Sequence, residues 1–280
     1  MSLPGKKYLV NGVNYHIHDE GDSDNVVLLL HGMPDTSSLW RHQANALVSA
    51  GYRVVVPDML GYGLTDKPKD VARYEGEHLI ADMLAIIDVL GLKNINIVGH
   101  DWGSFVSWEL VFRKPELFNR HVTLSQGHPG AMFGSMSTES AKENWYMYLS
   151  TQVHAGELYA YNNFKFLREA WMPSHPDVDE VCARMADPEA MESMLNWDKA
   201  NQMASFYLAQ VSGELNYPNC TVPTMVLWGT RDAYLKEEWA IGSEDLMDAE
   251  FRYERIEEAS HWISLDKPEE VSAFILEWFK

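Results

Sequence analysis

The stretch that most constrains this chain runs from Ile95 to Ser104 and reads INIVGHDWGS. A short apolar run ends at Gly99, Asp101 follows two residues later, and Gly103 follows two residues after that. A helical spacing of apolar residues then begins. This order predicts a strand, a sharp turn and a helix, with the layout of a nucleophile elbow in which aspartate replaces serine. Because glycines let the backbone turn tightly, we expect the Asp101 side chain to stand exposed at the carboxyl end of the strand.

An aspartate at this turn favours one kind of chemistry. A carboxylate is already ionised near neutral pH, whereas serine needs a base to remove its proton. A carboxylate can displace a leaving group from a saturated carbon and form an ester, which a base must then hydrolyse by activating water. Taken alone, Asp101 could equally be a cap of the helix that begins near Trp102.

Length and composition predict one α/β domain that carries an insertion. The chain has 280 residues, of which 46% are hydrophobic, enough for a large core. A net charge of -19 disfavours nucleic acid and anionic membrane as partners. Cys182 and Cys220 form neither a disulfide framework nor a zinc spacing. Since neither a signal peptide nor a membrane-spanning run is recognisable, we expect a soluble, cytoplasmic protein without a metal.

Apolar runs and helical spacings alternate in the first half of the chain and again near its end. The expected strands cover residues 6–10, 13–19, 26–30, 52–57, 95–99, 121–124, 224–228 and 251–256. The expected helices cover residues 39–50, 77–90, 102–114 and 268–279. The segment between has no clear strand and shows helical patterns around residues 140–152, 164–171 and 188–211. We therefore predict a core domain of residues 1–126 and 216–280 and a helical cap of residues 127–215.

A second informative stretch is His31-Gly32-Met33-Pro34, which follows a buried strand. In hydrolases of this architecture, a loop here supplies one backbone N–H of the oxyanion hole. Met33 would be that donor, and the backbone N–H of Trp102 would be the other. The alternative is an ordinary loop between a strand and a helix.

Two further residues, Asp232 and His261, each follow a late strand on the face where α/β sheets bind ligands. The chain order Asp101, Asp232, His261 is the nucleophile, acid and histidine order of an α/β-hydrolase triad. His261 would activate water against the ester on Asp101. Asp232 would hold the imidazole tautomer and stabilise the ring once it is protonated.

The chain resembles the α/β-hydrolase superfamily, in the branch of soluble epoxide hydrolases and haloalkane dehalogenases. The resemblance covers nearly the whole chain and rests on His31–Asp35, Leu39–Arg41, Gly61–Gly63, Gly99–Gly103, Trp228–Asp232 and Ser260–His261. It implies an α/β-hydrolase fold with a mostly parallel eight-stranded sheet flanked by helices, and an inserted helical lid. It also implies a small apolar electrophilic substrate, no cofactor, and a monomer or homodimer.

The resemblance leaves two reactions open, which differ in the leaving group. Epoxide hydrolases protonate the opened oxygen with two lid tyrosines. Tyr146 looks like the first of them, whereas the position expected for the second holds Asp198. Other expected substrate contacts are the aromatic residues Trp102, Trp145, Tyr207 and Trp262.

A haloalkane dehalogenase would instead bind the halide with N–H donors. Trp102 would be one, but the loop position that often holds an asparagine is Met33 here. We favour epoxide hydrolysis because Tyr146 is present and that asparagine is absent. An inactive binding protein on the same fold is the alternative from a different class.

Overall fold

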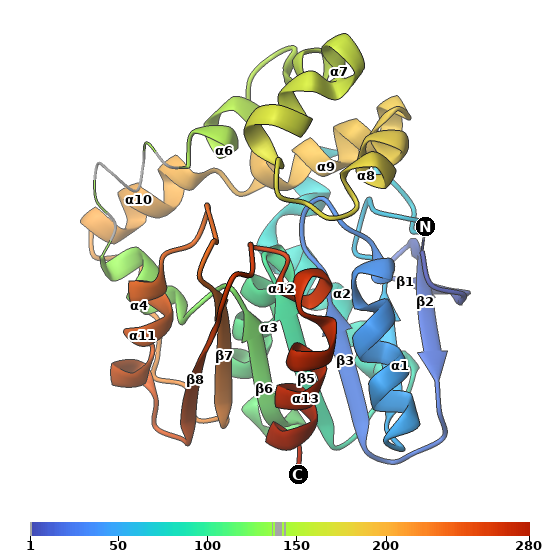
Figure 1. Cartoon of the computed structure of the whole chain (residues 1–280), viewed down its shortest axis with the longest axis vertical. Helices are drawn as coiled ribbons and strands as arrows, with labels where there is room; N and C mark the ends of the chain where they lie inside the picture. The colour runs from blue at the N-terminus through green and yellow to red at the C-terminus, as the bar shows by residue number, and fades with distance from the viewer. Residues whose placement is uncertain (1, 136, 138–141, 143) are drawn as a thin grey trace.

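The computed structural model describes residues 2–135, 137, 142 and 144–280. Its eight strands form one sheet in the order β1-β2-β4-β3-β5-β6-β7-β8 (Figure 1). The pairs β1–β2 and β2–β4 are antiparallel, and all other neighbours are parallel. The strands are β1 (Lys6–Val10), β2 (Val13–Glu20), β3 (Val26–Leu30), β4 (Arg53–Pro57), β5 (Ile95–His100), β6 (Phe118–Leu124), β7 (Thr224–Gly229) and β8 (Phe251–Ile256).

Helices cover both faces of this sheet. On one face, α1 and α13 pack side by side, and α2 and α3 pack together on the other (Figure 1). The helices outside the inserted segment are α1 (Arg41–Ser49), α2 (Gly76–Val89), α3 (Trp102–Arg113), α11 (Glu237–Ile241), α12 (Ile263–Asp266) and α13 (Pro268–Trp278). The predicted α/β-hydrolase fold with a mostly parallel, eight-stranded sheet is confirmed.

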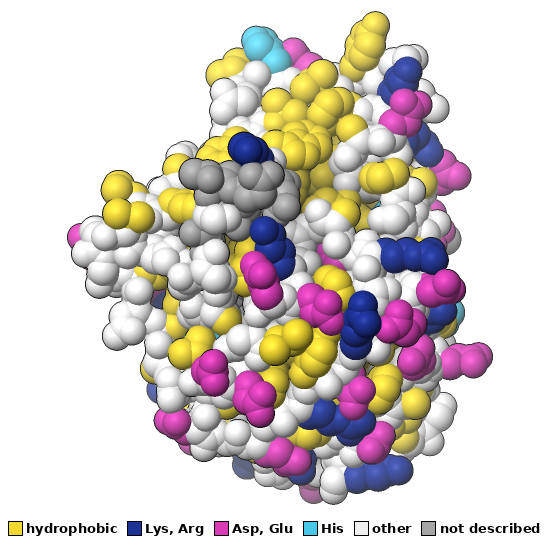
Figure 2. Space-filling model, turned by 60° about the vertical axis from the view of Figure 1, so that its left-hand side comes forward, with side chains coloured by type: hydrophobic (Ala, Val, Ile, Leu, Met, Phe, Trp, Pro, Cys, Tyr) yellow, Lys and Arg dark blue, Asp and Glu magenta, His cyan; other side chains and the backbone are white. Residues whose placement is uncertain are grey.

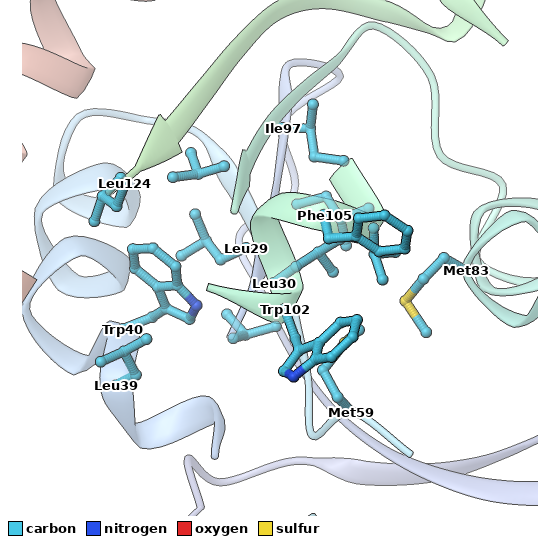
Figure 3. Packing of buried hydrophobic residues seen from close by; sticks show 14 of the residues in the cluster. Leu29, Leu30, Leu39, Trp40, Met59, Met83, Ile97, Trp102, Phe105 and Leu124 are labelled. Atoms are coloured by element: carbon cyan, nitrogen blue, oxygen red, sulfur yellow. The ribbon is translucent and has the colours of Figure 1, made fainter. Parts of the chain in front are cut away.

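The central strands β3 and β5 are buried along their whole length because helices cover both faces of the sheet. All five residues of β3 are buried, and all six of β5. Figure 3 shows Leu29 and Leu30 of β3 packed among Trp40, Trp102 and Phe105. This packing fixes the end of β5, and with it the position of the residue that follows.

The inserted segment begins with α4 (Pro129–Gly134) and continues as a layer of helices at one end of the sheet (Figure 1). Residues just after β3 and β4 bind it. Arg184 donates to the carbonyl of Pro34, and Trp197 Nε1 donates to the carbonyl of Leu60. The layer therefore covers the carboxyl ends of the parallel strands. Its helices, called the helical layer below, are α6 (Trp145–Ser150), α7 (Ala155–Phe166), α8 (Val178–Met185), α9 (Pro188–Ala200) and α10 (Met203–Val211).

The helical layer differs from the expected pattern in its last part. The helix expected over 188–211 is two helices, α9 and α10. Asn201 lies at the break, where its Nδ2 donates to the carbonyls of Tyr74 and Trp197 and its Oδ1 accepts from the N–H of Gly76. Partners 125 residues away thus end α9. The helical pattern expected from residue 140 is described only in part, because residues 140, 141 and 143 lie outside the described residues.

Several large hydrophobic side chains of the inserted segment are exposed. Figure 2 shows them gathered over the upper part of the molecule, whereas charged side chains are spread over the lower part. Val153, Tyr161, Leu208 and Val211 are each at least 70% exposed. Among the described residues, no helix combines the length and the apolar character needed to cross a membrane.

Candidate active site

The turn between β5 and α3 holds Asp101 in an unusual backbone conformation, with φ 54° and ψ -125°. A side chain at Gly103 would collide with the carbonyl of Leu30, so only glycine lets α3 approach β3 this closely. As a result, the Asp101 side chain projects past the strand end and lines a cavity between the sheet and the helical layer.

Each carboxylate oxygen of Asp101 has a different neighbour. Oδ1 accepts a hydrogen bond of 2.7 Å from the backbone N–H of Met33. Oδ2 lies 3.6 Å from His261 Nε2. Trp102 is the first residue of α3, so its N–H has no partner within the helix. The carboxylate at the elbow therefore faces a backbone donor on one oxygen and an imidazole on the other.

His261 lies between two carboxylates. Its Nδ1 is 2.8 Å from Asp232 Oδ2, while Asp232 Oδ1 accepts from the N–H groups of Tyr234 and Leu235. Burial favours a lower pKa for His261, but the charge of Asp232 and hydrogen bonds to Asp101 and Asp232 raise it to about 10. Burial favours a higher pKa for Asp232. The charge and hydrogen bond of His261 and the backbone N–H groups of Leu235 and Tyr234 lower that pKa. The resting site therefore holds an imidazolium between two carboxylates.

The cavity in front of Asp101 is largely apolar. Side chains from the core and from the helical layer both contribute, among them Met33, Phe105, Phe133, Trp171, Phe206 and Tyr234. A cavity of this kind suits a small apolar ligand whose orientation is set by a few polar groups. Those groups come from Asp101, His261, Tyr146 and Asp198, which line the same cavity.

The structure brings only part of the expected aromatic set to this cavity. Trp102 and Trp262 line it. Trp145 is 38% exposed and packs edge-on against Tyr146, outside the lining. The Tyr207 hydroxyl donates to the carbonyl of Ser137, and its side chain is likewise absent from the lining. Both belong to the packing of the inserted segment.

Tyr146 stands on α6 in a stack of aromatic rings. Its ring lies 5.8 Å from that of Trp171 and 5.4 Å, edge to face, from that of Tyr234. Burial, followed by the negative charges of Asp101 and Asp198, raises the pKa of Tyr146 well above 10. The phenol therefore keeps its proton at neutral pH and can donate a hydrogen bond into the cavity.

Two residues at the site were not anticipated from the sequence. Tyr234 packs edge-on against His261 at 5.0 Å and donates its hydroxyl to the carbonyl of Trp171. Asp35 binds His175 Nε2 at 3.2 Å and Trp262 Nε1 at 3.1 Å, and thus links the core to the helical layer beside His261. Tyr234 lies two residues after Asp232, and Asp35 lies two residues after Met33. This proximity in the sequence was the only signal for either residue.

Two buried histidines of β2 have hydrogen-bond partners in other segments. His16 Nδ1 lies 3.0 Å from Asp58, and His18 Nδ1 lies 2.7 Å from the carbonyl of Pro4. Within the described part of the chain, no group of three or more His, Cys, Asp or Glu side chains is placed to hold a metal ion.

Fold and site together define a class: an α/β protein with a carboxylate at a strand-to-helix elbow, next to a histidine–carboxylate pair. Comparison with known proteins agrees with this class. The description of the α/β-hydrolase fold family matches residues 25–268. The chain belongs to the α/β-hydrolase fold family.

Relatives resemble the chain along most of its length. An AB hydrolase superfamily protein of Bacillus subtilis, YfhM, is 28% identical and covers 96% of this chain and 96% of its own. Epoxide hydrolase 2 of Caenorhabditis elegans is also 28% identical, over 95% of this chain and 77% of its own. Among solved structures, an epoxide hydrolase from hot-environment metagenomes aligns with a TM-score of 0.87 and 26% identity, covering 100% of this chain and 99% of its own. A mutant of a Bacillus megaterium epoxide hydrolase aligns at 0.85 and 25%, covering 98% of this chain and 99% of its own.

Proposed function

We propose that this protein is an epoxide hydrolase that forms a vicinal diol through an ester on Asp101. The observation that carries the proposal is one apolar cavity in which a carboxylate, a histidine and a protonated phenol meet. The similarity to proteins named epoxide hydrolases supports the same reaction. Residues 127–215 would act as the cap that closes this cavity and excludes water from it.

The first step would be alkylation. Asp101 attacks one carbon of the epoxide, the ring C–O bond breaks, and the electron pair moves to the epoxide oxygen. Tyr146 donates a hydrogen bond to that oxygen as its negative charge develops. This step needs a carboxylate at Asp101, whose Oδ2 lies 3.6 Å from Nε2 of His261.

The second step would be hydrolysis of the ester. Esterification removes the negative charge of Asp101, one of the two carboxylates that raise the pKa of His261. The pKa of His261 therefore falls, so the imidazolium gives up its proton more readily at the stage when a base is needed. Neutral His261, oriented by Asp232, directs water at the ester carbonyl, and the N–H groups of Met33 and Trp102 stabilise the oxyanion.

Haloalkane dehalogenation is the second candidate. It would use the indole N–H of Trp102 as a halide donor, and Trp102 does line the cavity. The same cavity also holds the protonated phenol of Tyr146. A halide is a weak base that leaves without a proton, whereas the oxygen of an opened epoxide needs one, so this acidic group favours an epoxide.

The test is to trap the ester. A His261→Gln variant lacks the base for the second step, so incubation with an aryl epoxide should add the mass of the whole epoxide to the intact protein. The same variant is incubated with a short bromoalkane, and bromide release is measured. The matched control is the double variant with Asp101→Ala, which should form no adduct.

Each outcome separates one reading from the others. An Asp101-dependent adduct with the epoxide alone supports the proposal. An adduct with the bromoalkane alone, together with bromide release, would make the protein a dehalogenase. If neither compound reacts and the variant is folded by circular dichroism, the inactive binding protein becomes the better reading.

A further inference from the structure

We propose that Asp198 is a second proton donor of this cavity, a neutral carboxylic acid that protonates the epoxide oxygen together with Tyr146. The inference rests on the proposed function and deepens it. The inference assigns a function to a buried carboxyl group that no ion pair of the described residues explains.

The position of Asp198 is the first observation. It lies on α9 in the helical layer, is 1% exposed, and lines the same cavity as Asp101 and Tyr146. A carboxyl group buried this deeply is normally paired with a cation or saturated with hydrogen bonds. Asp101 and Asp232 both pair with His261, whereas Asp198 forms no ion pair among the described residues.

The unpartnered oxygen of Asp198 is the second observation. Ser150 and the indole of Trp102 lie near the carboxyl group and lower its pKa, but the Ser150 hydroxyl already donates to the carbonyl of Tyr146. The Oδ2 atom of Asp198 is buried and has no hydrogen-bond partner among the described residues. A proton on the Asp198 carboxyl group therefore finds no protein acceptor at Oδ2 among the described residues. The oxygen of a ligand bound in the cavity would be such an acceptor.

Electrostatics favour the protonated form. Burial raises the pKa of Asp198 to about 8, with a further contribution from the negative charge of Asp101, while Ser150 and Trp102 act in the opposite direction. The other titratable groups that face it are Tyr62 after β4, Tyr146 on α6 and Tyr159 on α7, all with raised pKa values. Near neutral pH, Asp198 is therefore the more acidic of the two donors.

The protons balance over one turnover. As Asp101 attacks, the ring C–O bond breaks and the epoxide oxygen takes the proton of Asp198, which leaves a hydroxy-ester and an Asp198 carboxylate. The proton that His261 releases on esterification restores Asp198 through solvent. Water then adds to the ester, its first proton passes by way of His261 to the departing diol, and the proton left on Asp101 restores the imidazolium.

The test measures ester formation alone, in the His261→Gln background, by rapid quenching and intact mass with an aryl epoxide between pH 6 and pH 10. With Asp198 present, the rate should fall above about pH 8, where the acid loses its proton. The variant Asp198→Asn keeps the shape of the side chain but has no transferable proton. It should react about 100-fold more slowly at pH 7 and lose the fall above pH 8. Asp198→Tyr should recover part of the rate and move the fall toward pH 10.

Asn196→Ala is the matched control, because Asn196 is also buried on α9 but does not line the cavity. Its rate and pH profile should match those of the parent. If Asp198→Asn is folded and keeps the parental rate and pH profile, the role of Asp198 is refuted while the hydrolase stands. If the parent His261→Gln protein forms no ester with the epoxide, both the proposed function and the role of Asp198 are refuted.

Discussion

Asp101 and Asp198 line the same cavity, but their neighbours stabilise a negative charge to different extents. Asp101 receives the N–H of Met33 and faces His261. Asp198 faces aromatic rings and the charge of Asp101, and Oδ2 lacks a partner among the described residues. The same residue type can therefore serve as an anionic nucleophile at one position and as a neutral acid at the other.

This difference predicts how Asp198 affects stability. The folded-state pKa of about 8 lies above the ordinary value, so the folded protein binds more protons than the unfolded chain between about pH 4 and pH 8, and stability falls as pH rises through that window. Asp198→Asn should match the parent at pH 4 and exceed it by on the order of 5 kcal/mol at pH 8. Thermal unfolding of both proteins across this range measures the difference, which a constant gap would contradict.

The sequence shows that Asp198 stands where a tyrosine is expected, but it does not predict the charge state of that aspartate. Local spacing indicates which face of α9 is buried, but the pKa depends on the rings and the carboxylate brought together by distant segments. The same limit explains Trp145 and Tyr207. Their residue type suits a substrate pocket, yet only the packing of α6 and α10 decides that they lie outside it.

The strands were predictable because their signal is local. Parallel strands buried on both faces appear as continuous apolar runs, and β3 and β7 are of this kind. The elbow was predictable for a similar reason, since two glycines around Asp101 are needed for the turn itself. The break between α9 and α10 had no such signal, because the partners that end α9 at Asn201 lie at Tyr74 and Gly76.

Asn201 should therefore stabilise the junction of α9 with the core more than its place in the sequence suggests. Asn201→Ala removes three hydrogen bonds and leaves buried backbone groups without partners. We expect a loss of about 2 kcal/mol in the free energy of unfolding, measured in urea. Gln202→Ala, next to it on the exposed side, should change stability by less than about 0.5 kcal/mol. If both substitutions changed the free energy of unfolding equally, the hydrogen bonds of Asn201 would not stabilise the junction.

At the scale of the whole molecule, Asp35 is a buried link between the core and the helical layer. Burial favours a higher pKa for Asp35, but the charge and hydrogen bond of His175 and the charge of Arg184 lower it. Two side chains of the inserted segment, His175 and Arg184, therefore stabilise the carboxylate of Asp35. Its contribution to stability is present above the unfolded pKa and is lost as pH falls.

Removing one partner should weaken the contact between the two parts. His175→Ala leaves the carboxylate of Asp35 buried with fewer partners, and we expect a loss of about 3 kcal/mol in the free energy of unfolding at pH 7. Cleavage within the helical layer by a low dose of protease should become faster. His42→Ala, at an exposed position on α1, is the control and should resemble the parent. Unchanged cleavage in His175→Ala would mean that other contacts hold the layer.

The order of strands has a consequence for how such a molecule can change. β6 and β7 are neighbours in the sheet, yet the whole inserted segment separates them along the chain. The entropy lost when the two ends of this segment are brought together grows only with the logarithm of its length. Doubling the length of a segment of roughly a hundred residues therefore costs only about 0.6 kcal/mol. The segment can therefore be lengthened, shortened or exchanged while the sheet keeps its register. The lining that this segment gives the cavity can therefore change while the elbow that holds Asp101 stays the same.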